Sequence, residues 1–291
     1  MGNMLTRVGR LGAMATTTLA VAGFASLGGL ARTQAATGAQ RAHRTGGGFT
    51  HPTPIDYQDH AGWMRLFNGK NLDGWEGNRE VWHVENGAIV GTSSRQHPSG
   101  TTNIYYTGRE PANFMLEVQF KLEGAGANGG VQYRSQTGPP PGRAAAAGDR
   151  HLAWAMTGYQ ADMDYANRYT GQLYEQGTGR GIIAWPGQAV ITAAGKTPLL
   201  LGTVGTADEV KAAIKVGEWN QYLIIADGFT MIHVINGRVT AVLVDQDAGR
   251  RATKGRIGFE IEGPGRVKIS YRDIWLKELD ARARRGERDA R

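Results

Sequence analysis

Three short segments between residues 128 and 175 concentrate polar and charged side chains whose types suit acid–base chemistry. The segments are residues 128–134, 158–162 and 171–175. They contribute one guanidinium, Arg134, and two carboxylates, Asp162 and Glu175. A positioned carboxylate can transfer a proton, and a guanidinium can stabilise charge that develops on an oxygen. The sequence therefore predicts a polar site, and a sugar-like ligand is the first expectation.

Each segment has the residue types of a strand, so the period of two predicts which side chains share a face. Gln160 should share a face with Asp162, and Gln132 should share a face with Arg134. If the two strands are neighbours, amide, carboxylate and guanidinium groups meet on one surface. The alternative is an ordinary ion pair on a solvated sheet face. The further candidates for ligand binding are Asn128, Tyr159, Tyr174 and Glu260, with Trp154, Tyr159 and Trp185 available to stack on a sugar ring.

The sequence does not contain the motifs of several other kinds of catalytic site. The seven histidines show no His-x-His or His-Glu-x-x-His spacing, there is no Gly-x-Ser-x-Gly turn, and the chain has no cysteine for thiol chemistry or disulfides. Residues 124–129 match the Gly-x-Gly-x-x-Gly pattern of dinucleotide sites, but a strand follows instead of a helix, which indicates a turn. We predict no cofactor and no metal site. A hard cation held by carboxylates and carbonyl oxygens stays open as an alternative.

The elements that must position these residues are short strands. The chain has 43 glycines and only 10 prolines among 291 residues, which is typical of many strands joined by tight turns. Asn-Gly pairs at 86–87 and 236–237 predict two hairpins. Residues 206–209 form a capping box that predicts one short helix. The expected fold is an all-β sandwich with one helix inserted.

The N-terminal residues predict that the protein is exported to the periplasm or outside the cell. Residues 1–35 have a basic start, an uncharged apolar stretch and small residues at the end, which indicates a signal peptide; the alternative is a membrane anchor. Residues 36–56 are expected to form a disordered linker and residues 281–291 a basic tail. The folded domain should span residues 57–280. Once the signal is removed, we expect no stable membrane anchor.

The net charge of +7 is a weak indication of nucleic-acid binding. Residues 1–35 hold three arginines and no acidic side chain, so their removal lowers the net charge to +4. Five further arginines lie in the tail, where a solvated chain end explains them. We therefore expect a small carbohydrate as the partner and no nucleic acid, and the sequence leaves the oligomeric state open.

Over about residues 63–279 the chain resembles the 3-keto-disaccharide hydrolase family, which was long described only as a domain of unknown function. The motifs that carry the resemblance are residues 66–75, 82–91, 128–134, 158–162, 219–220, 236–237 and 271–274. Gly129 stands where serine is usual, and Glu260 stands where an amide is usual. The resemblance implies a concanavalin-like jelly roll, a sandwich of two antiparallel sheets.

The resemblance also implies a substrate whose chemistry suits the clustered residues. A ketone at C3 of a glycoside acidifies the hydrogen on C2, and the aglycone on C1 is β to the carbanion. Asp162 or Glu175 would be the base, Arg134 would hold the enolate or keto oxygen, and the other carboxylate would assist the leaving group. Elimination followed by hydration would give net hydrolysis, and direct displacement by two carboxylates is the alternative. A non-catalytic, lectin-like carbohydrate-binding module is the competing class of protein.

Overall fold

The structure is a computed structural model that describes residues 44–45, 49–50, 52–138, 152–263 and 265–279. The chain divides into two units, residues 1–56 and residues 57–291. In the first unit, strands β1 (Arg44–Thr45) and β2 (Phe49–Thr50) pair with each other. The predicted signal peptide, part of the predicted linker and the predicted basic tail lie outside the described residues.

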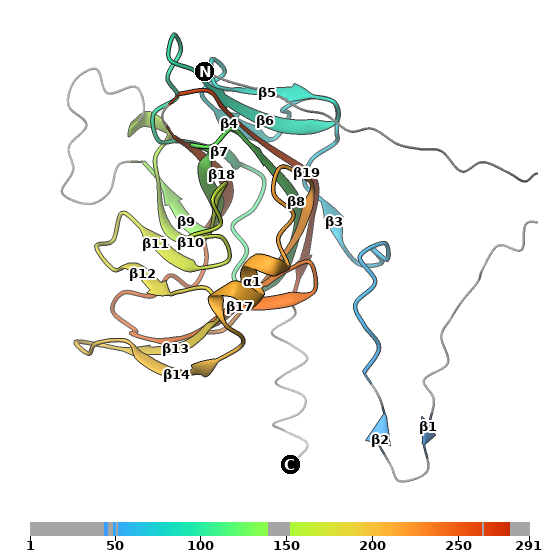
Figure 1. The fold of residues 1–291 in the computed structure, drawn as a ribbon, viewed down its shortest axis with the longest axis vertical. Coiled ribbons are helices and arrows are strands. Elements are labelled where there is room, and N and C mark those ends of the chain that lie inside the picture. Colours follow the sequence, from blue (N-terminus) through green and yellow to red (C-terminus); the bar gives the residue numbers. More distant parts are fainter. Residues whose placement is uncertain (1–43, 46–48, 51, 139–151, 264, 280–291) are drawn as a thin grey trace, which may run out of the picture. The chain divides into compact units, whose positions relative to one another are not determined.

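The second unit is built from two sheets (Figure 1). The seven-stranded sheet has, in spatial order, β12 (Gly181–Ala184), β11 (Leu173–Gln176), β10 (Met156–Asp164), β9 (Asn128–Thr137), β18 (Arg256–Glu262), β7 (Thr102–Tyr106) and β4 (Trp75–Gly77). The ten-stranded sheet has β14 (Leu199–Thr203), β13 (Gln188–Ala193), β17 (Arg238–Gln246), β16 (Thr230–Ile235), β15 (Asn220–Asp227), β8 (Phe114–Glu123), β19 (Val267–Glu278), β6 (Ala88–Ser93) and β5 (Trp82–Glu85), with β3 (Met64–Arg65) also pairing with β19. The pairs are antiparallel except β13 with β17, which are parallel.

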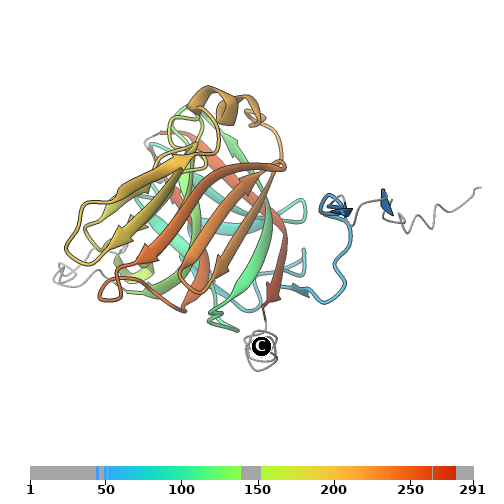
Figure 2. The ribbon, with the colours of Figure 1, turned by 90° about the horizontal axis from the view of Figure 1, so that it is seen from below.

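The hydrophobic core lies between the two sheets, which face each other in Figure 2. The rings of Trp75 and Phe259 from the seven-stranded sheet stack at 5.2 Å between centroids, and Phe259 stacks on Tyr271 of the ten-stranded sheet at 4.1 Å. All three side chains are buried. Large aromatic side chains contribute much of the apolar area that a fold buries, so this stack holds the sheets together. The expected all-β jelly-roll sandwich is confirmed.

The local signals of the sequence produce the predicted turns and helix. In the two hairpins Asn86 and Asn236 have φ of 49° and 50°, and the glycine that follows each also has positive φ. These are the dihedral angles that a two-residue type I′ turn requires. Helix α1 (Ala207–Ala212) begins with the predicted capping box of Thr206 and Glu209. A 3₁₀ turn, η1 (Leu152–Trp154), precedes β10.

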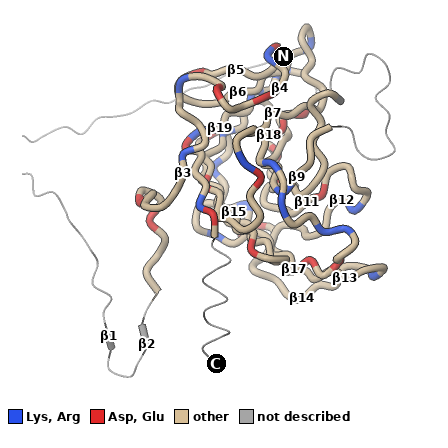
Figure 3. The backbone as a smooth tube through the Cα atoms, turned by 180° about the vertical axis from the view of Figure 1, so that it is seen from behind, with Lys and Arg blue, Asp and Glu red and all other residues tan. Residues whose placement is uncertain are grey.

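The surface of the domain carries both signs of charge. Figure 3 shows basic and acidic positions interspersed along the backbone of both sheets. Across the described ranges, no helix is long and apolar enough to cross a membrane.

Candidate functional site

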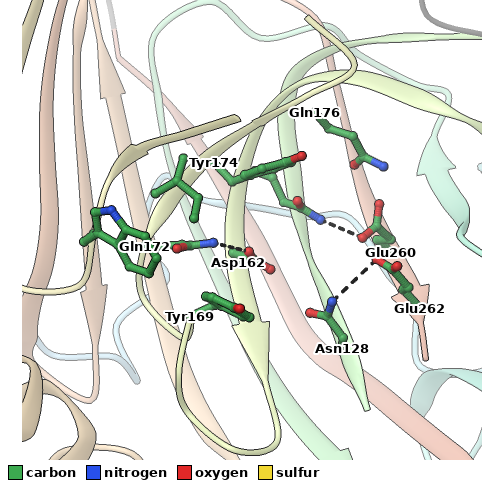
Figure 4. Close-up of a pocket in the computed structure, with 11 residues that line it drawn as sticks. Asn128, Asp162, Tyr169, Gln172, Tyr174, Gln176, Glu260 and Glu262 are labelled. Atoms are coloured by element: carbon green, nitrogen blue, oxygen red, sulfur yellow. Dashed lines mark hydrogen bonds between the residues drawn. The ribbon is translucent and has the colours of Figure 1, made fainter. Parts of the chain in front are cut away.

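A pocket of about 280 Å³ opens on the outer face of the seven-stranded sheet (Figure 4). Strands β9, β10, β11, β12 and β18 and the segments that follow β10 and β12 form its walls. Tyr159 and Ala161 of β10 are buried in the core, so the alternate residues of this strand face away from the core and into the pocket. The lining residues are Asn128, Gln160, Asp162, Tyr169, Gln172, Tyr174, Gln176, Ile182, Trp185, Glu260 and Glu262.

Strand register brings two carboxyl groups into one row across the sheet. Gly130 of β9 is directly opposite Asp162 of β10 on one side and Glu260 of β18 on the other. A Cβ atom on Gly130 would lie 2.5 Å from the Gln160 Cγ atom, so only glycine leaves room for that side chain. The Gln160 amide crosses this space and donates from Nε2 to Glu260 Oε1 at 3.0 Å. The row thus holds two acids at separate positions, with an amide between them.

Asp162 is a buried acid that stays hydrogen-bonded. It is 8% exposed, and it accepts from Gln172 Nε2 at 2.5 Å and from the Met163 backbone N–H at 2.9 Å. Burial raises the pKa of Asp162 to about 7, although these two hydrogen bonds act in the opposite direction. The charges of Asp164 and Glu262 act on the pKa of Asp162 in the same direction as burial. A carboxyl group in this state can give up or accept a proton near neutral pH.

Glu260 is buried more deeply and only half satisfied. It is 3% exposed, its Oε1 accepts from Gln160, and its Oε2 has no hydrogen-bond partner. The pKa of Glu260 is raised to about 8, mainly by burial; the charges of Glu262 and Asp162 act in the same direction and the hydrogen bond from Gln160 acts in the opposite one. Both pKa values therefore lie near neutral pH, and the pKa of Glu260 is the higher of the two. Two acids whose pKa values are separated in this way can take different roles.

The rest of the pocket is amphipathic. Tyr174 lies above the two acids, and burial followed by their negative charges raises the pKa of its hydroxyl. On another side the wall is apolar and aromatic, with Ile182, Trp185 and Tyr169. The rings of Tyr169 and Trp185 lie 6.2 Å apart, and Trp185 is 46% exposed, so it forms part of the rim. Within the described part of the chain, no group of three or more histidine, aspartate or glutamate side chains is placed to hold a metal ion.

Arg134 lies inside the sandwich, away from the pocket. It has φ of 48°, and the register of β9 shifts there against both of its neighbours, which marks a β-bulge. Its guanidinium donates to the backbone carbonyls of Ala112 at 2.8 Å and Gly228 at 2.7 Å, and it is 3.7 Å from Met231 Sδ in the opposite sheet. The expectation that Arg134 shares a face with Gln132 is wrong, because the bulge breaks the period of two.

Glu175 also faces the interior. It is directly opposite Tyr159, whereas Tyr174 is opposite Gln160, so Glu175 and Tyr159 point into the sandwich. The Glu175 carboxylate forms a buried ion pair with Arg180 at 2.5 Å, and Arg180 contacts Asp245 of β17 at 2.8 Å. The Tyr159 hydroxyl donates to the same Asp245 carboxylate at 2.5 Å. The predicted pocket positions of Glu175 and Tyr159 are therefore corrected, because alternation puts their neighbours there instead.

Five of the predicted site residues do line the pocket: Asn128, Gln160, Asp162, Tyr174 and Glu260. Gln132 is opposite Gln160 on the same face and donates to Gln176, but it is not part of the lining. Trp185 lines the pocket and Trp154 does not. Sequence reasoning missed Gln176 and Glu262, which the period of two identifies from Tyr174 and Glu260. It also missed Tyr169 and Gln172 as site residues, because their positions depend on the loop between β10 and β11; Gln172 lies within the polar segment 171–175, whereas Tyr169 carries no sequence signal.

The two buried acids should make stability depend on pH. Their pKa values are raised on folding, from 3.8 to about 7 for Asp162 and from 4.5 to about 8 for Glu260. The folded state therefore binds more protons than the unfolded state between about pH 4 and pH 8, and this stabilisation is lost as the pH rises through that range. We expect Glu260→Gln to gain stability relative to the parent as pH rises, measured by urea unfolding. Glu218→Gln, at an exposed position, is the control, and parallel curves for Glu260→Gln and the parent would contradict the prediction.

The fold and the pocket together define an all-β jelly-roll protein with an acidic, partly aromatic pocket on one sheet. Residues 62–277 match the family described as the 3-keto-alpha-glucoside-1,2-lyase-like domain, so the chain belongs to this glycosyl hydrolase-like family. The resemblance that the sequence motifs indicate is thereby confirmed. No curated protein matches the chain.

The chain also resembles several solved structures at low sequence identity. One is a candidate glycosyl hydrolase from Parabacteroides distasonis ATCC 8503, with 20% identity, a TM-score of 0.46 and coverage of 76% of this chain and 95% of that one. Another is the carbohydrate binding module CBM66 from Bacillus subtilis, with 14% identity, a TM-score of 0.45 and coverage of 73% and 99%. A protein with a galectin-like fold, also from Bacillus subtilis, has 14% identity, a TM-score of 0.46 and coverage of 71% and 90%. The likeness to each is one of fold, and no residue role follows from it.

Proposed function

We propose that this protein cleaves 3-keto-glycosides by elimination across C1 and C2, with Asp162 as the base and Glu260 as the acid. The observation that carries the proposal is the row of two buried acids on either side of Gly130. Their pKa values, about 7 and about 8, suit a base and an acid that work near neutral pH. The description of the family as 1,2-lyase-like supports an elimination. Export of the protein is part of the proposal and is supported by the N-terminal sequence alone.

The reaction follows from the acidity that the C3 ketone confers on C2. Asp162 removes the C2 proton, and the electron pair forms an enolate with the C3 carbonyl. The enolate collapses to a C1–C2 double bond, the bond from C1 to the aglycone oxygen breaks, and Glu260 protonates that oxygen. Water then adds at C1 and a proton returns to C2, which gives the free 3-keto sugar. The net reaction is hydrolysis, and both acids end in the protonation states in which they began.

In this mechanism neutral groups stabilise the enolate oxygen, the role that the sequence analysis predicted for the Arg134 guanidinium. Arg134 is enclosed between the sheets, and within the described part of the chain the pocket is lined by no lysine, arginine or histidine. The Tyr174 hydroxyl and the Gln176 amide line the pocket and can donate hydrogen bonds to the enolate oxygen. Neutral donors can stabilise an oxyanion when they are already oriented toward the oxygen on which the charge develops.

Cleavage in heavy water tests the mechanism directly. Incubation of the protein with a 3-keto-glucoside in heavy water should give a product with deuterium at C2, because the proton that Asp162 removes exchanges with solvent before it returns. Mass spectrometry and proton NMR measure the label, and the unoxidised glucoside, which has no acidic C2 hydrogen, should be neither cleaved nor labelled. Cleavage of the keto-glucoside without deuterium at C2 would favour direct displacement by the two carboxyl groups and rule out elimination.

A carbohydrate-binding module remains the second candidate, and the aromatic rim is the observation that favours it. Trp185 and Tyr169 offer ring faces beside polar groups, the arrangement by which proteins bind sugars without cleaving them. A module would bind sugars with the same affinity in the parent and in Asp162→Asn, and it would release no product from any keto-glycoside. Calorimetric titration together with a turnover assay distinguishes the two candidates.

A further inference from the structure

The charge of the pocket is one-sided. Three carboxyl groups line it, those of Asp162, Glu260 and Glu262. Glu262 accepts from Asn128 Nδ2 at 3.5 Å and is the most exposed of the three. The nearby Arg168 is bound outside the lining: its Nε is 3.4 Å from the Asp164 carboxylate and its guanidinium lies 5.2 Å from the Tyr169 ring centre. Within the described ranges, no side chain in the lining balances the negative charge.

The pocket also lacks donors for its own acceptors. Three buried oxygens of lining residues have no hydrogen-bond partner: Asn128 Oδ1, Gln172 Oε1 and Glu260 Oε2. Gln172 is 2% exposed and Glu260 is 3% exposed, so water satisfies these atoms poorly when a ligand fills the pocket. Figure 4 shows both side chains directed toward the space between the walls. The amide oxygens of Asn128 and Gln172 can only accept, and a buried acceptor without a partner is costly, so the ligand that fits best brings hydrogen-bond donors.

An ammonium group satisfies both conditions at once, because it carries three donors and a positive charge. We propose that the pocket selects glycosides by charge, favouring those with a protonated amino group over neutral ones and rejecting those with a carboxylate, sulfate or phosphate. Hydrogen bonds between an ammonium and a carboxylate are about twice as strong as neutral ones. An anionic group would meet the negative charge of Glu262 and of Asp162 when it is ionised, and no side chain of the lining supplies a positive charge. The inference names the substrate class of the same pocket and to that extent rests on the proposed function.

Binding of three matched monosaccharides tests the selection. Glucosamine, glucose and glucuronate share a pyranose ring and differ in charge, and their affinities can be measured at pH 7 and low salt by NMR titration. We expect glucosamine to bind about tenfold tighter than glucose or better, and glucuronate to bind at least about tenfold more weakly than glucose, as charge-assisted hydrogen bonds imply. Added salt should reduce both differences, because it screens charges near the surface.

Two matched substitutions locate the effect. Glu262→Gln removes one charge from the wall at an exposed position and should narrow the range of affinities, whereas Glu218→Gln removes one charge outside the pocket and should leave the range unchanged. Equal affinity for the three sugars, no binding of any of them, or tightest binding of glucuronate would overturn the inference. If the affinities of Glu262→Gln for the three sugars differ as much as those of the parent, Glu262 has no role in the selection.

The outcome is separable from that of the proposed function, because the three probes have no C3 ketone and report on binding alone. If glucosamine binds more tightly than glucose and glucose more tightly than glucuronate, but no keto-glycoside is cleaved, this inference is supported and the proposed reaction is wrong. If keto-glycosides are cleaved but the three sugars bind with equal affinity, the proposed reaction is supported and this inference is wrong.

Discussion

Asp162→Asn should lower kcat for 3-keto-glucoside cleavage by a factor of about 10² to 10⁴, the usual contribution of a positioned acid–base group. The amide cannot accept the C2 proton, so the first step loses its base. The substitution is nearly isosteric, and the Met163 N–H can still donate to the remaining side-chain oxygen. Gln172 can turn its free Oε1 toward the new amide, so the fold should be retained. KM should change much less than kcat.

The control for this variant is Asp73→Asn, the same chemical change at an exposed position outside the pocket. It should leave kcat and KM at the parent's values. Far-ultraviolet circular dichroism and urea unfolding check that both variants are folded. A folded Asp162→Asn protein with kcat within a few-fold of the parent would remove Asp162 from the mechanism.

The pH profile of the parent provides an independent check on the same pair. Asp162 must be ionised, so kcat/KM should rise with pH through about 7, and Glu260 must be protonated, so it should fall through about 8. The two acids interact, so the apparent values belong to the pair. Glu260→Gln should lose the fall at higher pH. A parent profile that keeps rising beyond about pH 9 would show that no acid of this kind takes part.

Arg180→Met should destabilise the fold by about 3 to 5 kcal/mol, the cost of removing one partner of a buried ion pair. Glu175 and Asp245 have carboxylate side chains that are 1% and 0% exposed, and both contact the Arg180 guanidinium. Without Arg180 these two negative charges remain buried, with hydrogen bonds from the hydroxyls of Thr178, Tyr159 and Thr192 and from the Asp247 backbone N–H in place of a cation. Urea unfolding, read as a shift of the midpoint at constant slope, measures the loss.

Arg238→Met is the matched control, because Arg238 pairs with Glu209 at 3.1 Å where the side chains are 35% and 55% exposed. Exposed pairs contribute about 0 to 1 kcal/mol, so this variant should stay near the parent. Glu175→Gln placed on the Arg180→Met background should recover part of the stability, since it removes one of the uncompensated charges. A loss below about 1 kcal/mol for Arg180→Met would show that solvent reaches the cluster.

The buried cluster also connects the predicted site with the observed one. Glu175 lies between Tyr174 and Gln176 on β11, so its attachment to Arg180 and Asp245 holds the strand that bears one wall of the pocket. The sequence predicted a functional role for Glu175 from its type and its neighbours. In the fold it ties β11 to β17 of the opposite sheet through Arg180.

The amino-acid sequence by itself determined the local elements and the family. The Asn-Gly pairs form the two hairpins and the capping box starts α1, because each acts through the dihedral angles and hydrogen bonds of a few consecutive residues. The motifs over about residues 63–279 correspond to the family match over residues 62–277. Five of the predicted site residues line the pocket for a similar reason: alternation along a strand is local.

Only the tertiary structure decided which of the charged residues meet. Asp162 and Glu260 are 98 positions apart in the chain and come into one row because both pair with Gly130, and strand order and register depend on packing between distant segments. The bulge at Arg134 turns its side chain into the core, and the pairing of Glu175 with Tyr159 places that carboxylate inside. The alternation of side chains along a strand predicts which residues share a face. Only the packing of the two sheets decides which of the two faces is buried.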